Sequence, residues 1–203
     1  MSTQDEKPDH QRPELPEFWD KRFRKGVTPW NAGGVPAALA AYATSRTDRP
    51  QTLVPGCGHA WEAGWLARLG WPVTALDFSP SAVDAARAAL GDWSGQLLCA
   101  DFFRFTPEQP YDLVYERAFL CAMPRRLWTD YGRRVHELLA PGGRLAGFFF
   151  FSDEPKGPPF GITPQELDAL LGPWFEREDD RAVDDSLPVF AGRERWQVWR
   201  RLS

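Results

Sequence analysis

The strongest constraint on the fold is an alternation of short apolar runs with longer helical segments from residue 50 onward. Patterns typical of buried strands occur at Thr52–Pro55, Val73–Leu76, Gln96–Ala100, Tyr111–Tyr115 and Leu145–Phe151. Helical patterns follow at Ala60–Leu69, Pro80–Leu90, Pro124–Leu139 and Thr163–Leu171, with Ser79 and Thr163 as N-caps and Pro141–Gly143 as a turn. Strands separated by helices of this length form parallel βαβ units, so the pattern predicts a doubly wound α/β fold with helices on both faces.

The two ends of the chain depart from this alternation. Phe175–Ala182 and Glu194–Arg201 have strand patterns with no helix between them, which predicts a hairpin and hence one antiparallel strand in a mostly parallel, seven-stranded, Rossmann-like sheet. Residues 1–13 are polar and contain proline, so we expect a disordered tail. Residues 14–203 are expected to form a single domain, in which residues 14–48 carry two short helices and act as an N-terminal helical lid.

Composition excludes several functional classes. The 203 residues carry a net charge of −4 without basic clusters, which disfavours a nucleic-acid partner. No apolar run approaches the length of a membrane span. The three cysteines and three histidines have no metal-ligand spacing, so no metal site is expected. We expect a cytoplasmic monomer that acts on a small molecule.

Acidic residues and glycines follow the predicted strands at the positions where α/β sheets bind ligands. The first strand ends at Gly56-Cys57-Gly58, and the next three end at Asp77, Asp101 and Glu116. Ligands of open α/β sheets bind at the carboxyl ends of the strands. Asp77 follows Gly56 by about 20 residues, the separation at which an acidic residue binds ribose hydroxyls. These features together predict a nucleoside-containing ligand.

The residue after the glycine turn separates two classes of such ligand. Dinucleotide-binding sequences have a third glycine three residues after the second one, where this chain has Trp61. A bulky indole there disfavours a pyrophosphate. Adenosine with a short zwitterionic tail fits better, and a nicotinamide oxidoreductase is therefore disfavoured.

Several blocks of sequence resemble one family of enzymes. Val54–Gly58 and Leu76–Ser79 resemble the cofactor motifs of class I S-adenosylmethionine-dependent methyltransferases. The blocks Phe18-Trp19, Thr28-Pro29-Trp30, Tyr115–Ala118, Cys121–Pro124 and Gly157–Phe160 resemble, in this order, the thiopurine S-methyltransferase superfamily, which includes thiol, thiocyanate and halide methyltransferases. The resemblance covers roughly residues 16–201.

The resemblance implies a set of functional residues. Cofactor contacts are expected at Trp30, Gly56, Cys57, Gly58, Asp77, Phe78, Asp101, Phe102 and Glu116. Arg117 and Trp30 are the expected catalytic residues: Arg117 faces the acceptor, and Trp30 covers the site as part of the lid. Asn31 departs from the aspartate that is common after the Pro-Trp pair, so the resemblance does not define the polar contacts of the lid.

The implied reaction is methyl transfer from S-adenosylmethionine, which leaves S-adenosylhomocysteine, to a soft nucleophile such as a thiol, thiopurine, thiocyanate or halide. Such an acceptor needs alignment and a dry pocket more than a strong base. Trp30, Phe119, Phe149, Phe151 and Phe160 are candidate pocket walls, and Arg117 would attract the anion unless it forms a surface ion pair with Glu116 or Asp112. Two alternatives stay open: an O- or N-methyltransferase with Glu116 or His59 as general base, and an inactive S-adenosylmethionine-binding protein.

Overall fold

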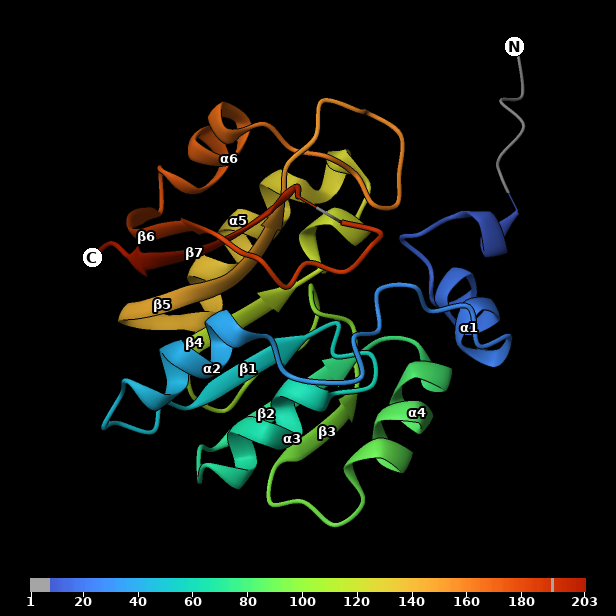
Figure 1. The fold of residues 1–203 in the computed structure, drawn as a ribbon, viewed down its shortest axis with the longest axis horizontal. Coiled ribbons are helices and arrows are strands. Elements are labelled where there is room, and N and C mark those ends of the chain that lie inside the picture. Colours follow the sequence, from blue (N-terminus) through green and yellow to red (C-terminus); the bar gives the residue numbers. More distant parts are fainter. Residues whose placement is uncertain (1–7, 191) are drawn as a thin grey trace.

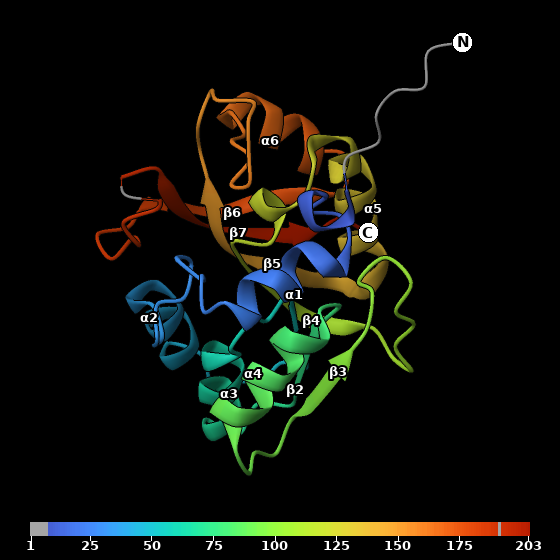
Figure 2. The same cartoon turned by 90° about the vertical axis from the view of Figure 1, so that its right-hand side faces the viewer.

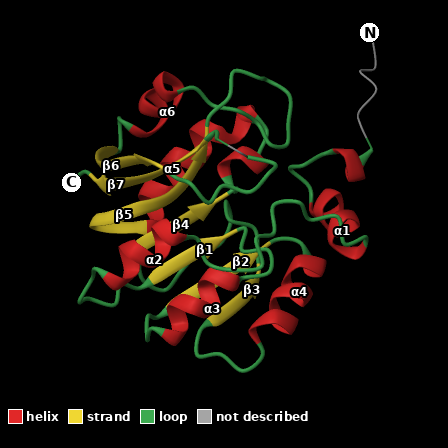
Figure 3. Ribbon diagram, in the orientation of Figure 1, coloured by secondary structure: helices red, strands yellow, loops and turns green. Residues whose placement is uncertain are grey.

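A single seven-stranded sheet organises the structure, a computed structural model that describes residues 8–190 and 192–203. The strand order is β3-β2-β1-β4-β5-β7-β6 (Figures 1 and 3). The strands are β1 Thr52–Pro55, β2 Val73–Asp77, β3 Gln96–Cys99, β4 Tyr111–Arg117, β5 Leu139–Phe150, β6 Phe175–Ala182 and β7 Glu194–Arg201. Strand β7 runs antiparallel to both of its neighbours, and β1 to β5 are parallel. The predicted mostly parallel sheet with one antiparallel strand is confirmed.

Helices cover both faces of this sheet, as predicted (Figure 2). The α-helices are α1 Pro16–Arg24, α2 Ala37–Thr44, α3 Trp61–Arg68, α4 Pro80–Leu90, α5 Trp128–Leu138 and α6 Pro164–Leu171, and short 3-10 helices lie at η1 Asp9–Gln11, η2 Leu120–Ala122 and η3 Arg125–Leu127. One core cluster packs α2, α3 and α4 against one face, and a second packs α5 and α6 against the other.

Alternation along the strands explains why two cores form. In β1, Leu53 belongs to the α5–α6 core and Val54 to the α2–α4 core. Strand β4 divides in the same way between Val114 on one face and Tyr115 on the other. Successive side chains of a strand point to opposite faces, so a strand that is apolar at both positions must be covered on both sides.

The strand order reverses between β1 and β4. From β1 the chain adds β2 and β3 on one side, and then returns to place β4 on the other side. At such a reversal the connections after the two strands leave in opposite directions and open a crevice at the carboxyl ends. The crevice here lies beyond Pro55 and Arg117, the last residues of β1 and β4.

Two predicted boundaries differ from the structure by more than two residues. The expected turn at Pro141–Gly143 lies inside β5, because the pairing of β4 with β5 shifts from Tyr111–Leu139 to Leu113–Arg144 and accommodates those residues as an irregularity. The helix expected from Pro124 begins only at Trp128, after η3. Of the tail expected to be disordered, residues 1–7 lie outside the described residues, and Asp9–Gln11 form a 3-10 helix.

The N-terminal helix lies away from the sheet. Figure 1 shows α1 beyond the carboxyl ends of the parallel strands, beside α4. Asp20 joins the two helices: its Oδ1 accepts hydrogen bonds from Ser79 Oγ (2.6 Å) and Ser81 N (2.9 Å) at the start of α4. Ser79 is itself the N-cap of α4, because its side chain accepts from Ala82 N. A carboxylate is favourable at a helix N-terminus, where backbone N–H groups lack partners.

Candidate active site

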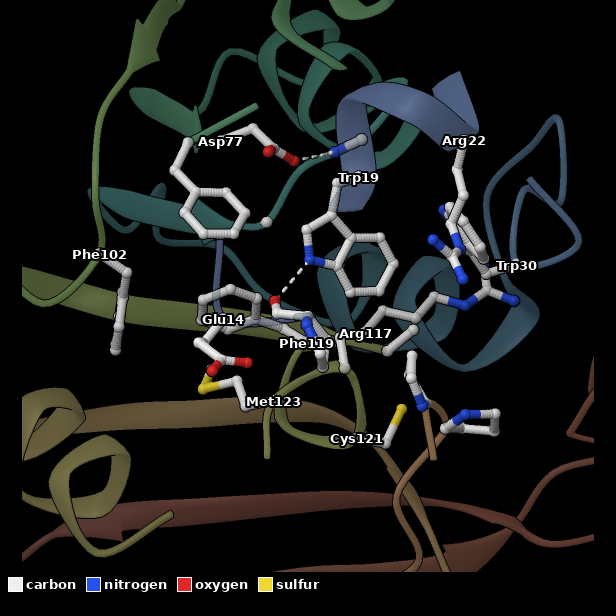
Figure 4. Close-up of a pocket in the computed structure, with 18 of the residues that line it drawn as sticks. Glu14, Trp19, Arg22, Trp30, Asp77, Phe102, Arg117, Phe119, Cys121 and Met123 are labelled. Carbon is white, nitrogen blue, oxygen red and sulfur yellow. Dashed lines mark hydrogen bonds between the residues drawn. The ribbon is translucent and has the colours of Figure 1, made fainter. Parts of the chain in front are cut away.

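A cavity of about 300 Å³ opens at the carboxyl ends of β1, β2 and β4. Segments that are far apart in sequence line it: the strand ends with the chain that follows β4, the N-terminal segment that includes Trp19 and Trp30, Pro158 and Pro159 between β5 and α6, and Val189 and Phe190 of the β6–β7 connection. In the view of Figure 4, Asp77 and Cys121 lie at opposite ends of the cavity. We call the part formed by Arg117, Cys121, Pro158, Pro159, Val189 and Phe190 the distal end.

The glycine turn after β1 brings backbone N–H groups to the cavity. Gly56 and Gly58 both line it and both have positive φ, +59° and +52°, a conformation that glycine adopts at little cost. A Cβ atom on Gly56 would collide with the ring of Phe119. Gly58 N donates a hydrogen bond to Asp77 Oδ2 (3.2 Å), which ties the turn to the end of β2 (Figure 4).

Asp77 is a buried carboxylate at the cavity wall, with 7% of its surface exposed. Its Oδ1 accepts a second hydrogen bond from Ser79 N at 3.0 Å. Burial raises the pKa of Asp77 to about 6, although the backbone donors Ser79, Gly58 and Phe78 oppose that rise. The group is therefore ionised at neutral pH and offers acceptor oxygens to a hydroxylated ligand.

Flat apolar surfaces flank this carboxylate. Phe78 and Phe102 line the same part of the cavity, and Asp101 lies at its rim with a partly exposed side chain. Asp101 Oδ1 accepts from Phe103 N at 2.8 Å, which orders the turn after β3. Carboxylates and flat apolar side chains that line one cavity suit a ligand with both hydroxyl groups and an aromatic ring.

Aromatic side chains of the N-terminal segment close the opposite wall. Trp19 and Trp30 meet edge to face with ring centroids 5.4 Å apart, and Phe23 lies 6.2 Å from Trp30. Trp19 Nε1 donates to Pro13 O at 2.8 Å, visible in Figure 4. Asn31, which stands in place of the aspartate that is common in the family, makes a polar contact of its own. Its Oδ1 accepts a hydrogen bond from Trp61 Nε1 at 2.9 Å, which ties the N-terminal segment to α3.

Arg117 lies at the cavity with little of its side chain exposed, and it is paired with a residue that the sequence analysis did not single out. Its Nη1 lies 3.1 Å from Glu62 Oε1 on α3, and the two side chains are only 9% and 14% exposed. Burial alone would lower the pKa of Arg117, but Tyr115 and Glu62 raise it above the ordinary value. The partner is thus neither Glu116 nor Asp112, and the pair is not on the surface.

A smaller recess of about 60 Å³ adjoins the cavity beside this pair. Cys57, Trp61, Glu62 and Tyr115 line it, and Trp30 and Arg117 line both spaces. Arg117 Nε and the Tyr115 hydroxyl are buried and have no hydrogen-bond partner among the described residues. Of the expected cofactor residues, Cys57 therefore faces the recess and not the main cavity.

Glu116 lies outside the lining of the main cavity. It is 1% exposed, and its Oε1 accepts from Phe119 N (2.8 Å) and Leu120 N (3.0 Å), so the carboxylate holds the turn into η2. Burial raises the pKa of Glu116 to about 7 despite these two donors. His59, the other candidate base, also lies outside the lining of the cavity and packs against Phe23 at 5.4 Å between ring centroids.

The distal end has walls that differ from those expected. Trp30 and Phe119 line the cavity, but Phe149, Phe151 and Phe160 do not: Phe149 is buried in the α5–α6 core, and the other two pack against that core. Cys121, Val189 and Phe190 form the wall instead, within one apolar cluster that includes Phe150. Sequence periodicity cannot show this, because Phe190 belongs to a connection without regular structure.

The described residues include no group of three or more His, Cys, Asp or Glu side chains arranged to bind a metal ion. Among residues 8–190 and 192–203, no helix has the length and apolar character required to cross a membrane.

Comparison with known proteins agrees with this geometry. The family model for thiopurine S-methyltransferase matches residues 15–202. The chain is 30% identical to the probable thiol methyltransferase 2 of Arabidopsis thaliana over 91% of this chain and 85% of that protein. It is also 30% identical to the thiopurine S-methyltransferase of Methylococcus capsulatus, over 80% of this chain and 83% of that protein.

A solved structure supports the fold. The 1,6-didemethyltoxoflavin-N1-methyltransferase of Burkholderia thailandensis, whose crystal structure contains S-adenosylhomocysteine, superposes with a TM-score of 0.76 at 19% identity. The match covers 100% of this chain and 94% of that one. Because the family model spans nearly the whole chain and the cavity lies where this fold binds nucleosides, the chain belongs to the thiopurine S-methyltransferase family and is an S-adenosylmethionine-dependent methyltransferase.

Proposed function

We propose that this methyltransferase transfers the methyl group to the sulfur atom of a small-molecule thiol. The observation that carries the proposal is the distal end of the cavity, which presents the Arg117 guanidinium but neither candidate base. Glu116 faces the interior, and His59 packs on Phe23. A thiol with an ordinary pKa near 8.5 is already partly ionised at neutral pH and needs no strong base, whereas a hydroxyl acceptor does.

The other acids of the cavity are poorly suited to act as bases. Glu14 accepts hydrogen bonds from Arg126 (2.6 Å) and Arg12 (3.2 Å). Burial alone would raise the pKa of Glu14, but the backbone, Arg12 and Arg126 together hold it below the ordinary value. Asp77 and Asp101 accept backbone N–H bonds at the nucleoside end. The relatives named above as thiol and thiopurine methyltransferases agree with a sulfur acceptor.

The residues present fit the cofactor. S-adenosylmethionine supplies a methyl group that its sulfonium sulfur already activates. In our proposal Asp77 accepts the ribose hydroxyls, Phe78 and Phe102 flank the adenine, and Gly56 and Gly58 allow close approach of the tail. The orphaned Arg117 Nε is a buried donor that a ligand can satisfy.

The protein side of the reaction is then binding, alignment and exclusion of water. Trp30 covers the junction between the cavity and its recess, so that its removal would admit solvent. Arg117 stabilises the ionised thiol by its positive charge, within a wall that is otherwise apolar. Well-arranged proximity and orientation lower such a barrier by about 7–11 kcal/mol.

The test measures S-adenosylhomocysteine formation with a panel of aromatic and aliphatic thiols, thiocyanate, iodide and catechols. On the sulfur proposal the rate rises with pH toward the pKa of each thiol and shifts when a more acidic thiol is used. Arg117→Ala should lower kcat/KM for thiols by one to two decades, about 1.4–2.7 kcal/mol. Arg117→Lys keeps the charge but loses the planar fork, so kcat/KM should fall less than in Arg117→Ala.

Further measurements distinguish loss of the Arg117 charge from misfolding, and a thiol acceptor from an oxygen or nitrogen acceptor. Because Arg117→Ala leaves the partly buried Glu62 without its partner, the double variant with Glu62→Gln is measured beside it. A pH profile that ignores thiol acidity, together with loss of activity in Glu116→Gln or His59→Gln, would establish an O- or N-methyltransferase instead. Binding of S-adenosylhomocysteine without turnover of any acceptor would indicate an inactive binding protein.

A further inference from the structure

We infer that Val189 and Phe190 of the β6–β7 connection determine which acceptors this enzyme takes, and that they select apolar thiols over small hydrophilic anions. This inference rests on the proposed function for its sulfur chemistry. Both residues line the distal end of the cavity together with Cys121, Pro158 and Pro159. They come from a part of the chain more than 60 residues beyond the last cavity residue of β4 in sequence, where no motif marks them.

The wall that they form is fixed. Phe190 is 3% exposed and packs on Phe150 with ring centroids 5.5 Å apart. Phe190 N donates to Leu187 O (2.8 Å), and Arg193 N donates to Phe190 O (2.9 Å), so a tight turn presents the ring. A buried ring held by packing and by its own turn offers a defined surface to a ligand.

The connection is also anchored to the N-terminal segment. Asp185 Oδ2 accepts a hydrogen bond from Ala37 N at 2.7 Å, which satisfies a backbone donor in the first turn of α2. Trp30 and Val189 belong to the same apolar cluster around Cys121. The segment that covers the cofactor end and the connection that walls the distal end therefore hold each other in place.

The chemistry of the wall favours apolar acceptors. Arg117 is the one charged residue among those that define the distal end, and its guanidinium also pairs with Glu62 at 3.1 Å. A small anion such as thiocyanate would lose its hydration here and would gain only the charge of Arg117, which a thiolate gains as well. An aromatic thiol would in addition gain contact with Phe190, Val189 and the two prolines.

The experiment uses the full chain and two readouts. The first is the ratio of kcat/KM for thiophenol to that for thiocyanate. The second is the calorimetric Kd of thioanisole, the methylated product of thiophenol, for the protein saturated with S-adenosylhomocysteine. In Phe190→Ala both the ratio and the thioanisole affinity should fall about tenfold or more, because a buried aromatic contact is lost. Val189→Trp, which fills the distal end, should have the same effect on both.

Leu187→Ala is the matched control, because Leu187 packs on the same cluster but does not line the cavity. It should lower stability without changing either readout, and S-adenosylhomocysteine affinity should stay at the wild-type value in all three variants. Phe190→Leu provides a milder variant if Phe190→Ala does not fold. An unchanged ratio and unchanged thioanisole affinity in folded Phe190 and Val189 variants would overturn the inference. If the wild type methylates no thiol but thioanisole binding follows the predicted pattern, the proposed function is wrong, whereas the role of Val189 and Phe190 in ligand selection is supported.

Discussion

Asp77 combines burial, two backbone donors and a position on the cavity wall, and these properties lead to a binding prediction. Asp77→Ala should weaken S-adenosylhomocysteine binding about ten- to a hundredfold, or about 1.5–3 kcal/mol, because charge-assisted bonds to the ribose are lost. Burial raises the pKa of this carboxyl to about 6, so wild-type affinity should be full above pH 7 and decline as pH falls through 6. Calorimetry at several pH values measures both effects.

The control for this prediction is Asp84→Ala, since Asp84 is an exposed acid on α4 that pairs with Arg87 and lies outside the cavity lining. It should leave affinity and its pH dependence unchanged. Equal affinity in wild type and a folded Asp77→Ala protein would remove Asp77 from the cofactor site.

Glu116 supports a second prediction, which concerns stability. Its pKa rises from an ordinary 4.5 to about 7 in the fold because of burial. The folded state then binds the proton more tightly than the unfolded state, so stability from this group is present below pH 4.5 and is lost as pH rises through 7. The loss is about 3 kcal/mol at high pH. Glu116→Gln keeps an oxygen for the N–H groups of Phe119 and Leu120 and removes the charge.

Urea unfolding at pH 4.5 and pH 8 measures this effect. The difference in unfolding free energy between Glu116→Gln and wild type should shift in favour of the variant at pH 8. Asp77 also titrates in this range, but it does so in both proteins and cancels from the difference. A difference that is the same at both pH values would contradict the raised pKa of Glu116.

Among the elements, α1 and α4 are joined by hydrogen bonds to one side chain. Asp20 accepts from Ser79 Oγ and Ser81 N, and Ser79 N in turn donates to Asp77, so hydrogen bonds connect the N-terminal helix to the proposed ribose carboxylate. Asp20→Ala should increase amide exchange in α1 about tenfold, because the lost bonds are worth about 1–3 kcal/mol. Hydrogen exchange with and without S-adenosylhomocysteine measures this change in the exchange rate of α1.

Cofactor should slow exchange in residues 14–30 of the wild type if this segment acts as a lid. Glu17→Ala, an exposed acid on the same helix, is the control and should change neither state. Equal exchange with and without ligand in the wild type would exclude closure of the segment.

The strand bounds and the side-chain contacts differ in how far the sequence could predict them. Strands β1 and β7 were predicted with their observed bounds, because their apolar residues are buried. Strand β6 was also predicted with its observed bounds, although only Phe175 in it is buried. The start of β5 was not, because Gly142 and Gly143 predict a turn while tertiary pairing with Tyr111 continues the strand. Asp77 and Phe102 could be placed from strand ends and motifs. The Glu62 partner of Arg117 could not, since it depends on how α3 packs against β4.

At the scale of the whole molecule, the cavity joins segments that are far apart in sequence. The strand ends contribute Asp77 and Arg117, the N-terminal segment contributes Trp30, and the β6–β7 connection contributes Phe190. A ligand that contacts all of them binds the folded chain and not the unfolded one. S-adenosylhomocysteine at 100 times its Kd should therefore add about 2.7 kcal/mol to the free energy of unfolding. For a chain of this size each kcal/mol raises Tm by about 2–4 °C, so the expected increase is about 5–11 °C.

Thermal unfolding followed by fluorescence measures this increase, and the ten tryptophans provide the signal. At the same ligand concentration Asp77→Ala should lose half of the shift or more, because its Kd is about ten- to a hundredfold higher, whereas Asp84→Ala should keep it. NAD at equal concentration should give no shift, since Trp61 occupies the position where dinucleotide sites have glycine. Stabilisation by NAD as large as that by S-adenosylhomocysteine would mean that the cavity accepts a pyrophosphate. Because the shift depends on the assembled cavity, Asp20→Ala should reduce it as well, by an amount that reports how strongly docking of α1 is coupled to cofactor binding.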